Sequence, residues 1–245
     1  MVSFESEIIF HLGPINITNT LLDTLLVDII LVGGSVFVSK KLSIIPNFFQ
    51  AALESIVEVF YDLTKSVSQA RVEAIFPFVL SFFLFILLVN WSGLIPGVGT
   101  IGFLEDKKLV PILRSATSDL NTTLALALVS AIATHLISIK TIGMKDYLSR
   151  YFSLNPINLF IGILEIISEI TKVISLSFRL FGNIFAGEVV ILTVSSIFAF
   201  VFPIPFLFLE IIVGFVQALV FAMLTMAFMA ILTTPHHSEK EVKTV

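Results

Sequence analysis

The chain has 245 residues, of which 57% are hydrophobic and only 13% are charged, and its mean hydropathy is +1.05. Soluble domains carry about 25% charged residues, so this composition excludes an ordinary soluble globular protein and predicts an integral membrane protein. The formal net charge of −4 argues against a nucleic-acid partner, and the absence of cysteine excludes disulfides, thiol chemistry and cysteine-based metal sites.

The first 20 residues contain two glutamates and no basic residue. A signal peptide needs a positively charged first region, so this segment does not fit one. Three apolar stretches follow at residues 21–38, 75–95 and 120–139, and each is close to the roughly 20 residues that a membrane-spanning helix needs. Pro96 and Gly97 end the second stretch. The pattern predicts three spans.

Residues 47–74, between the first two spans, have a different pattern. Apolar residues such as Phe49, Leu53 and Phe60 recur at steps of three and four, with acidic and basic residues interspersed. This period predicts an amphipathic helix at the membrane surface. A helix packed on a soluble partner is the alternative.

Residues 156–201 are almost uninterruptedly apolar. A helix of about 45 residues would be about 68 Å long, roughly twice the thickness of the hydrocarbon layer, so it must tilt strongly, break or form two pieces. Pro203 and Pro205 then predict a turn before a last apolar helix at residues 206–232. The predicted fold is one all-α membrane domain of about five to six membrane helices. They include the surface helix and a C-terminal hairpin of two long, tilted helices over residues 156–232, followed by a tail at 233–245.

The basic residues of the loops predict the orientation. Nine of the 14 lie in the first loop, the third loop and the tail, against three in the second loop. The positive-inside rule therefore places residues 1–20 outside and the tail in the cytoplasm. The remaining two are Lys172 and Arg179, within the long apolar stretch.

Arg179 lies near the centre of a stripe of small and polar residues on one face of the predicted helix, because about 100° separates successive residues. A guanidinium cannot lose its proton to escape burial, and small neighbours let another helix approach closely. Glu188 is nine positions further on, about half a turn around the axis, and is expected to point toward the last helix. The stripe comprises Glu165, Ser168, Lys172, Ser175, Arg179, Gly182, Asn183, Ala186 and Val190.

Two polar patches are separated by Arg179. The first contains Glu165, Ser168, Glu169 and Lys172, nearer the cytoplasm, and the second contains Asn183, Glu188, Glu210 and Gln217, nearer the outside. Two wet cavities with a fixed cation between them suit a rotary or alternating ion carrier, whereas one continuous pore would leak. The pattern indicates ion movement.

Each of these groups also has a purely structural interpretation. Glu165, Glu169 and Lys172 are spaced for ion pairs along the helix, and Glu188 and Glu210 can each bond a backbone group. Arg179 can be an interface anchor, Asp119 can cap the third span, and His135 can make a helix–helix hydrogen bond. His236 and His237 are adjacent in a polar tail and lack the spacing of a helical metal site. No phosphate-binding glycine loop or nucleophile–base set is present, and we expect no metal or cofactor.

The segment SLSFRLFGNIFAGE at residues 175–188 resembles the signature of subunit a of the F-type ATP synthase, the stator of its membrane motor. VNWSGLIPG, TSDLNTTLALAL and VQALVFAMLT occur in the order found in that family, so the resemblance covers about residues 70–230. It implies two long tilted helices lying against a ring of c subunits, with the peripheral-stalk b subunits and the rest of the complex as further partners. ATP chemistry would then reside in other subunits, and this chain would not be an enzyme.

The resemblance also implies roles for individual residues. Arg179 matches the essential arginine. Asn183, Glu188 and Gln217 match the outer half-channel, Glu165 matches the cytoplasmic one, and Asp119 matches an acidic position in the outer pathway. Related proteins often combine one Glu and one His where this chain has Glu188 and Glu210, and two nearby carboxylates tend to share a proton. The signature looks bacterial or plastid-like, which favours a bacterial cell membrane over a thylakoid or mitochondrial inner membrane.

The competing classes are a secondary transporter and a purely structural membrane subunit. A transporter would show paired halves with broken helices, and a structural subunit has no use for an unpaired arginine between acidic clusters. The sequence favours a proton-translocating subunit and leaves sodium open as the coupling ion.

Overall fold

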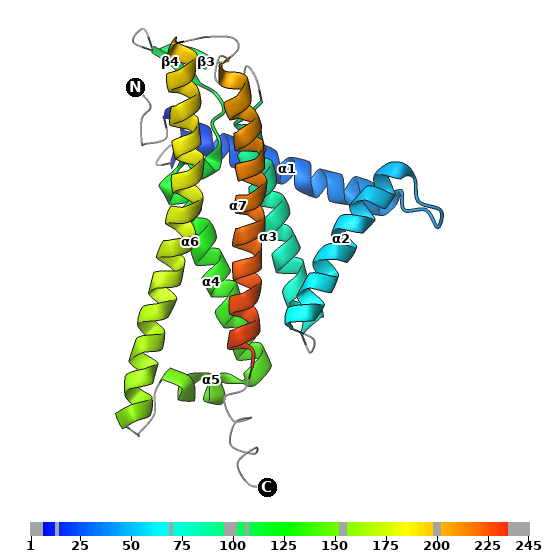
Figure 1. Cartoon of the computed structure of the whole chain (residues 1–245), viewed down its shortest axis with the longest axis vertical. Coiled ribbons are helices and arrows are strands. Elements are labelled where there is room, and N and C mark those ends of the chain that lie inside the picture. The colour runs from blue at the N-terminus through cyan, green and yellow to red at the C-terminus, as the bar shows by residue number, and fades with distance from the viewer. Residues whose placement is uncertain are drawn as a thin grey trace.

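The computed structural model describes residues 7–12, 15–68, 71–95, 102–105, 108–151, 156–197 and 202–234. These residues form seven α-helices, one 3₁₀ turn and two short hairpins (Figure 1). In chain order the elements are β1 (Ile8–Leu12), β2 (Ile15–Thr18), α1 (Asn19–Lys40), α2 (Phe48–Val67), α3 (Val72–Ser92), β3 (Gly102–Glu105), β4 (Lys108–Pro111), η2 (Ala116–Ser118), α4 (Leu120–Ile142), α5 (Met144–Tyr151), α6 (Pro156–Ile197) and α7 (Pro203–Leu232). Both hairpins are antiparallel pairs, β1 with β2 and β3 with β4.

Four helices are long and apolar enough to cross a membrane: α1, α3, α4 and α7. The predicted spans at residues 21–38, 75–95 and 120–139 are therefore confirmed as helices, with shifted ends. The middle one differs most, because α3 ends at Ser92 and Gly93–Ile95 form a turn outside it. The all-α prediction is confirmed, although the two short hairpins were not predicted.

The long apolar stretch forms a single helix, α6, of 42 residues. At 1.5 Å per residue it is about 63 Å long, about twice the hydrocarbon thickness. The sequence left open whether it breaks, and within Pro156–Ile197 it does not. Figure 1 shows α6 and α7 running side by side while α1 crosses their direction. If α1 spans the membrane, α6 and α7 must be steeply tilted.

The predicted turn at the two prolines is wrong. Pro203 and Pro205 lie in the first turn of α7, which begins at Pro203 rather than at residue 206. The first backbone N–H groups of a helix have no partner inside the helix, so a proline there loses nothing, and its fixed φ angle suits the helical conformation.

The core lies where α3 packs against α7, with α2 and α4 alongside. Polar side chains near the C-terminal end of α3 form hydrogen bonds to α7 within this apolar core. The Asn90 side chain donates to the Gly214 carbonyl at 2.9 Å and accepts from the Thr117 hydroxyl at 2.7 Å, and Trp91 Nε1 donates to the Ile211 carbonyl at 3.2 Å. Such hydrogen bonds hold α3 and α7 together where apolar burial alone provides little preference.

The predicted amphipathic helix at residues 47–74 is shorter in the structure. It forms α2, which ends at Val67, while Val72 already begins α3. α2 packs on α3 through Phe60, whose ring centroid is 4.5 Å from that of Phe83. The amphipathic pattern thus marks a helix packed on a neighbouring helix of its own chain, and its position at the membrane surface stays a prediction.

The short helix α5 was not predicted. Gly143 ends α4 with a φ of +91°, a conformation that residues with a side chain rarely adopt, so the chain can turn directly into α5. Figure 1 shows α5 and the end of α7 at one extremity of the long helices and β3–β4 at the other. α5 also packs closely on α6.

Replacing Gly162 by alanine should destabilise the contact between α5 and α6. A Cβ atom on Gly162 would overlap the backbone carbonyl of Tyr151, and backbone cannot move away as a flexible side chain can. We expect a loss of about 2 kcal/mol, typical of overpacking. Thermal unfolding of the detergent-solubilised protein measures the effect. Gly34→Ala is the matched control, because nothing lies within 4 Å of its added methyl group; equal unfolding temperatures for both variants would contradict this account.

Candidate functional site

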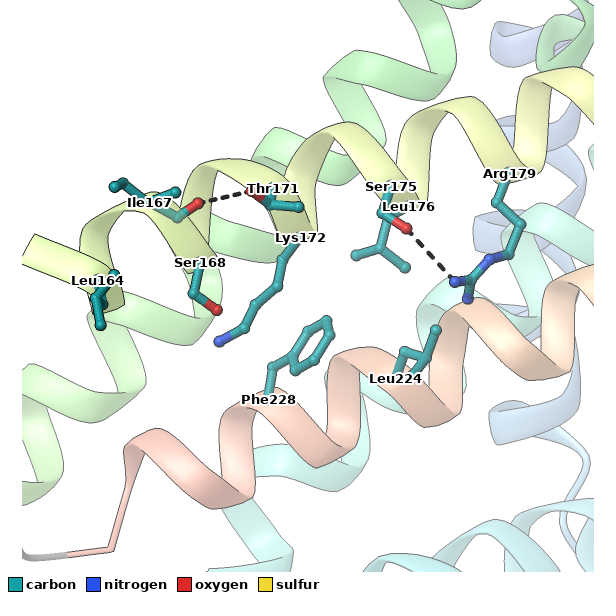
Figure 2. A pocket seen from close by; sticks show the side chains of 10 residues that line it. All are labelled: Leu164, Ile167, Ser168, Thr171, Lys172, Ser175, Leu176, Arg179, Leu224 and Phe228. Atoms are coloured by element: carbon teal, nitrogen blue, oxygen red, sulfur yellow. Dashed lines mark hydrogen bonds between the residues drawn. The ribbon is translucent and has the colours of Figure 1, made fainter. Parts of the chain in front are cut away.

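Arg179 is exposed on α6, near the middle of that helix. Its Nη2 atom donates to Ser175 Oγ at 3.5 Å, one turn earlier (Figure 2). Among the residues that the structure describes, no carboxylate forms an ion pair with it. The guanidinium is therefore held at the surface of an apolar helix without a counter-charge from the described part of the chain.

A cavity of about 420 Å³ lies between α6 and α7 and reaches Arg179. Its polar lining consists of Ser168, Thr171, Lys172, Ser175 and Arg179 from α6, while Leu224 and Phe228 come from α7 (Figure 2). The predicted stripe therefore brings Ser168, Lys172 and Ser175 together with Arg179. Beyond the arginine, Gly182, Asn183, Ala186 and Val190 continue the stripe and are exposed.

Glu165 was predicted on the same face, but it does not line this cavity. Its Oε1 atom is 2.9 Å from Arg150 Nε of α5, and both side chains are largely buried. Arg150 also donates to the carbonyl of Leu232 at the end of α7, at 3.4 Å. Helical periodicity does not identify Arg150 as the partner of Glu165, because Arg150 lies on α5, a helix that the sequence did not predict.

Glu169 and Lys172 form the ion pair that their spacing allows, with Lys172 Nζ 2.7 Å from Glu169 Oε1. The ion pair that the structural interpretation allowed is therefore present, and Lys172 also lines the cavity. His135 of α4 also approaches Glu169, with 3.9 Å between Nε2 and Oε2. The predicted helix–helix hydrogen bond of His135 exists, and its partner is Tyr147 of α5 at 3.0 Å.

Glu188 is bound by Arg114, a residue that the sequence showed only as a loop charge. Arg114 Nε and Nη2 donate to the two carboxylate oxygens of Glu188, each at 3.1 Å. The Arg114 side chain is 10% exposed and that of Glu188 28%. The expected direction of Glu188, toward the last helix, thus has to be revised: its carboxylate is held by the segment between β4 and η2.

Glu210 on α7 is 4% exposed, and its buried Oε1 atom has no hydrogen-bond partner among the residues that the structure describes. It lies against Gly187, where an added Cβ atom would overlap the Glu210 carboxyl group. Glu210 and Glu188 therefore lie near the same turn of α6 but in different surroundings. Gln217, two turns further along α7, is half-buried, and Asn183 is exposed.

Asp119 caps α4, as its structural interpretation predicted, by accepting from the Asn121 backbone N–H at 2.9 Å. Its other oxygen accepts from the Thr20 hydroxyl at 3.4 Å. Sequence reasoning missed Asp23, which is 1% exposed and accepts from the Ala116 backbone N–H and the Ser92 hydroxyl, each at 3.0 Å. The signal in the sequence was that Asp23 is an acidic residue within the apolar stretch at residues 21–38.

Among the described ranges no group of three His, Cys, Asp or Glu side chains is arranged to hold a metal ion. His236 and His237 lie outside the described residues.

Comparison with known proteins identifies the family. The profile described as "ATP synthase A chain" matches residues 21–230. The ATP synthase subunit a of Moorella thermoacetica is 35% identical over 222 residues, covering 91% of this chain and 94% of that protein. Subunit a 2 of Pelobacter propionicus is 35% identical, covering 92% and 91%, and subunit a of Legionella pneumophila is 33% identical, covering 93% and 91%.

The chain belongs to the ATP synthase subunit a family. The resemblance stated from SLSFRLFGNIFAGE is confirmed. A member of this family is the ion-translocating subunit of the membrane sector and a component of the ATP synthase complex. The four candidate spans agree with a multi-pass integral membrane protein.

Removing the Arg114 guanidinium from this subunit a should leave Glu188 half-buried without its two hydrogen bonds. We expect Arg114→Gln to destabilise the protein by about 1–3 kcal/mol, because an unsatisfied, partly buried carboxylate bears the desolvation cost alone. The double variant Arg114→Gln, Glu188→Gln should recover part of that loss. Thermal unfolding of the detergent-solubilised complex measures both; additive effects of the two single substitutions would show that the pair contributes nothing.

Proposed function

We propose that this subunit a is the proton-translocating stator of the membrane sector, with two offset half-channels kept apart by Arg179. The observation that carries the proposal is the position of Arg179. It is an exposed guanidinium without an ion-pair partner in the described chain, and it lines a cavity between α6 and α7 to which α7 contributes the apolar residues Leu224 and Phe228. The acidic groups on either side of it have other partners or are buried apart from it.

The cavity lined by Ser168, Lys172 and Ser175 is our candidate for the cytoplasmic half-channel. Glu165 lies nearby, held by Arg150 at the α5 end of α6. The space of about 420 Å³ is large enough for water, since a single water needs far less volume, and five polar side chains in its largely apolar lining can hydrogen-bond to it. Protons would pass between this cavity and the cytoplasm.

The outer half-channel is assigned to Asn183, Glu188, Glu210 and Gln217, with Asp119 further along the pathway. Glu188 and Glu210 are close to one turn of α6 but differ in their surroundings, because Glu188 faces the Arg114 cation whereas Glu210 Oε1 has no hydrogen-bond partner in the described part of the chain. Two carboxyl groups that differ in this way can hand on a proton in sequence without sharing it.

The proposed partner of the exposed stripe is the ring of c subunits. Gly182 and Ala186 present little side chain, which allows a helix of the ring to pass close to Arg179. A ring carboxylate becomes neutral by accepting a proton from the outer half-channel and can then face lipid at lower cost than the charged form. At the cytoplasmic half-channel Arg179 favours the ionised form and promotes release. The b subunits of the peripheral stalk are further proposed partners.

The orientation is proposed from the positive-inside rule, with residues 1–20 outside and the C-terminus in the cytoplasm. The arrangement of the ends supports it, since α5 and the end of α7 lie at the extremity opposite β3–β4 (Figure 1). A bacterial cell membrane is the proposed location, because the signature around Arg179 is bacterial or plastid-like and the similar proteins above come from bacteria. ATP chemistry is assigned to other subunits.

Arg179→Gln should abolish ATP-driven proton pumping in inverted membrane vesicles, because a neutral amide neither favours the ionised ring carboxylate nor blocks protons moving directly between the half-channels. Pumping is followed with a pH-sensitive dye after ATP addition, and passive proton leak is measured in the same vesicles. Lys65→Gln removes an exposed cation of α2 and should leave pumping unchanged. Normal pumping by the Arg179→Gln complex would disprove the role given to this residue.

The coupling ion is tested separately. If it is the proton, ATP hydrolysis by isolated membranes should not depend on added sodium at neutral pH, and a protonophore should collapse the ion gradient. Hydrolysis that rises with sodium concentration would instead assign sodium to the same half-channels, with Arg179 in the same place.

A further inference from the structure

A row of four polar side chains joins α5, α4 and α6 beside the cavity. Tyr147 Oη is 3.0 Å from His135 Nδ1, His135 Nε2 is 3.9 Å from Glu169 Oε2, and Glu169 Oε1 is 2.7 Å from Lys172 Nζ. The row ends in the cavity, because Lys172 is one of its lining residues (Figure 2). The function proposed above makes no use of Tyr147, His135 or Glu169.

The two carboxylates at this end of α6 have chemically different partners. Glu165 is paired with Arg150, a guanidinium that keeps its proton under all ordinary conditions. Glu169 lies between an ammonium group and an imidazole, and an imidazole exchanges protons readily near neutral pH. Glu169 therefore has a neighbour that can take or give a proton, whereas the Arg150 partner of Glu165 cannot.

The geometry around His135 suits proton transfer. Its side chain is 29% exposed and that of Glu169 is 15% exposed, so the chain itself encloses neither group completely. Tyr147 holds the ring through Nδ1, and its own ring lies edge-on to the imidazole, with 6.0 Å between centroids. When Nδ1–H donates to the Tyr147 oxygen, Nε2 keeps a lone pair on the side of Glu169.

We infer that His135 and Glu169 form a proton relay between the cytoplasm and the cavity, in addition to the position of Glu165. The inference rests on the proposed function, since it supplies protons to the cytoplasmic half-channel. During ATP-driven pumping, Nε2 takes a proton from the cytoplasmic side, and the resulting imidazolium gives it to the Glu169 carboxylate through one bridging water, because the two atoms are 3.9 Å apart. Glu169 then releases the proton to water beside Lys172, the residue through which the row meets the cavity, and returns to a carboxylate. No net charge is left on the relay.

The electrostatics of His135 depend on charged and titratable groups inside and outside this row. Within the row these are Tyr147, Glu169 and Lys172; outside it they are Glu165 on α6, Arg150 and Tyr151 on α5, and Lys140 near the end of α4. The part of α7 that lies here contributes the Phe228 ring, whose centroid is 4.8 Å from Lys172 Nζ. The Lys172 ammonium thus lies between this ring and the Glu169 carboxylate, and it stays in place through each transfer.

His135→Gln is the decisive variant, because glutamine can hydrogen-bond to Tyr147 and Glu169 but cannot carry a proton. The complex is examined in inverted vesicles, where the cytoplasmic face is outside and the buffer sets its pH. We expect the initial rate of ATP-driven pumping to fall several-fold and the shape of its pH profile to change, because the variant lacks the imidazole that takes up and releases the proton. Tyr147→Phe should cause a smaller change of the same kind, because the ring loses its anchor but keeps its nitrogens.

Lys145→Gln, on the exposed side of α5, is the matched control and should leave both rate and profile unaltered. An unchanged profile with His135→Gln overturns the relay, and so does an equal loss at every pH, which marks a structural role. If His135→Gln complexes do not assemble, the profile of Tyr147→Phe decides in the same way. Failure of the proposed function would be seen in a different experiment, as continued proton pumping by the Arg179→Gln complex.

Discussion

The structure depends on one constraint: the Arg179 guanidinium cannot lose its charge, and it is held at the surface of an apolar helix. Charges at membrane depth cost from about 3 to more than 10 kcal/mol unless they are paired or reach water. Three other cations of the described chain satisfy this requirement with a carboxylate each: Arg114 with Glu188, Arg150 with Glu165, and Lys172 with Glu169. Arg179 has a cavity beside it instead, and in our proposal its cost is reduced by water in that cavity and by a passing carboxylate.

The fold keeps this charge in a fixed place. α6 is continuous over 42 residues, so the backbone at Arg179 moves only together with the helix. α7 packs along α6 and is itself held by α3 through Asn90 and Trp91. Small polar pairs such as Ser130 with Thr225, 2.9 Å apart, connect α4 to α7. In our proposal the chain is a stator and needs this rigidity, because each proton crossing about 100 mV delivers only about 2.3 kcal/mol, and a loosely held barrier would lose that energy through proton leak.

On each side of Arg179, an arginine from another segment pairs with a carboxylate of α6. At one end Arg150 connects Glu165 with the end of α7, and at the other Arg114 connects Glu188 with the segment before α4. Arg114 lies in the segment before α4, and Arg150 lies on α5, which follows α4. The segments on either side of α4 therefore supply the positive charges that pair with the carboxylates of α6. Each carboxylate is thereby fixed on its own side of Arg179.

Much of this protein follows from its sequence, because apolar length and helical period are local properties. The membrane class, three spans, the long helix and the stripe around Arg179 were all predictable, and the family followed from the residues near it. The short helix α5, the start of α7 at Pro203 and the partners of Glu165, Glu188 and His135 were not. Those depend on which distant segments meet: Arg114 reaches Glu188 across 74 positions. Periodicity determines the face on which a side chain lies, but only packing in three dimensions determines what it meets there.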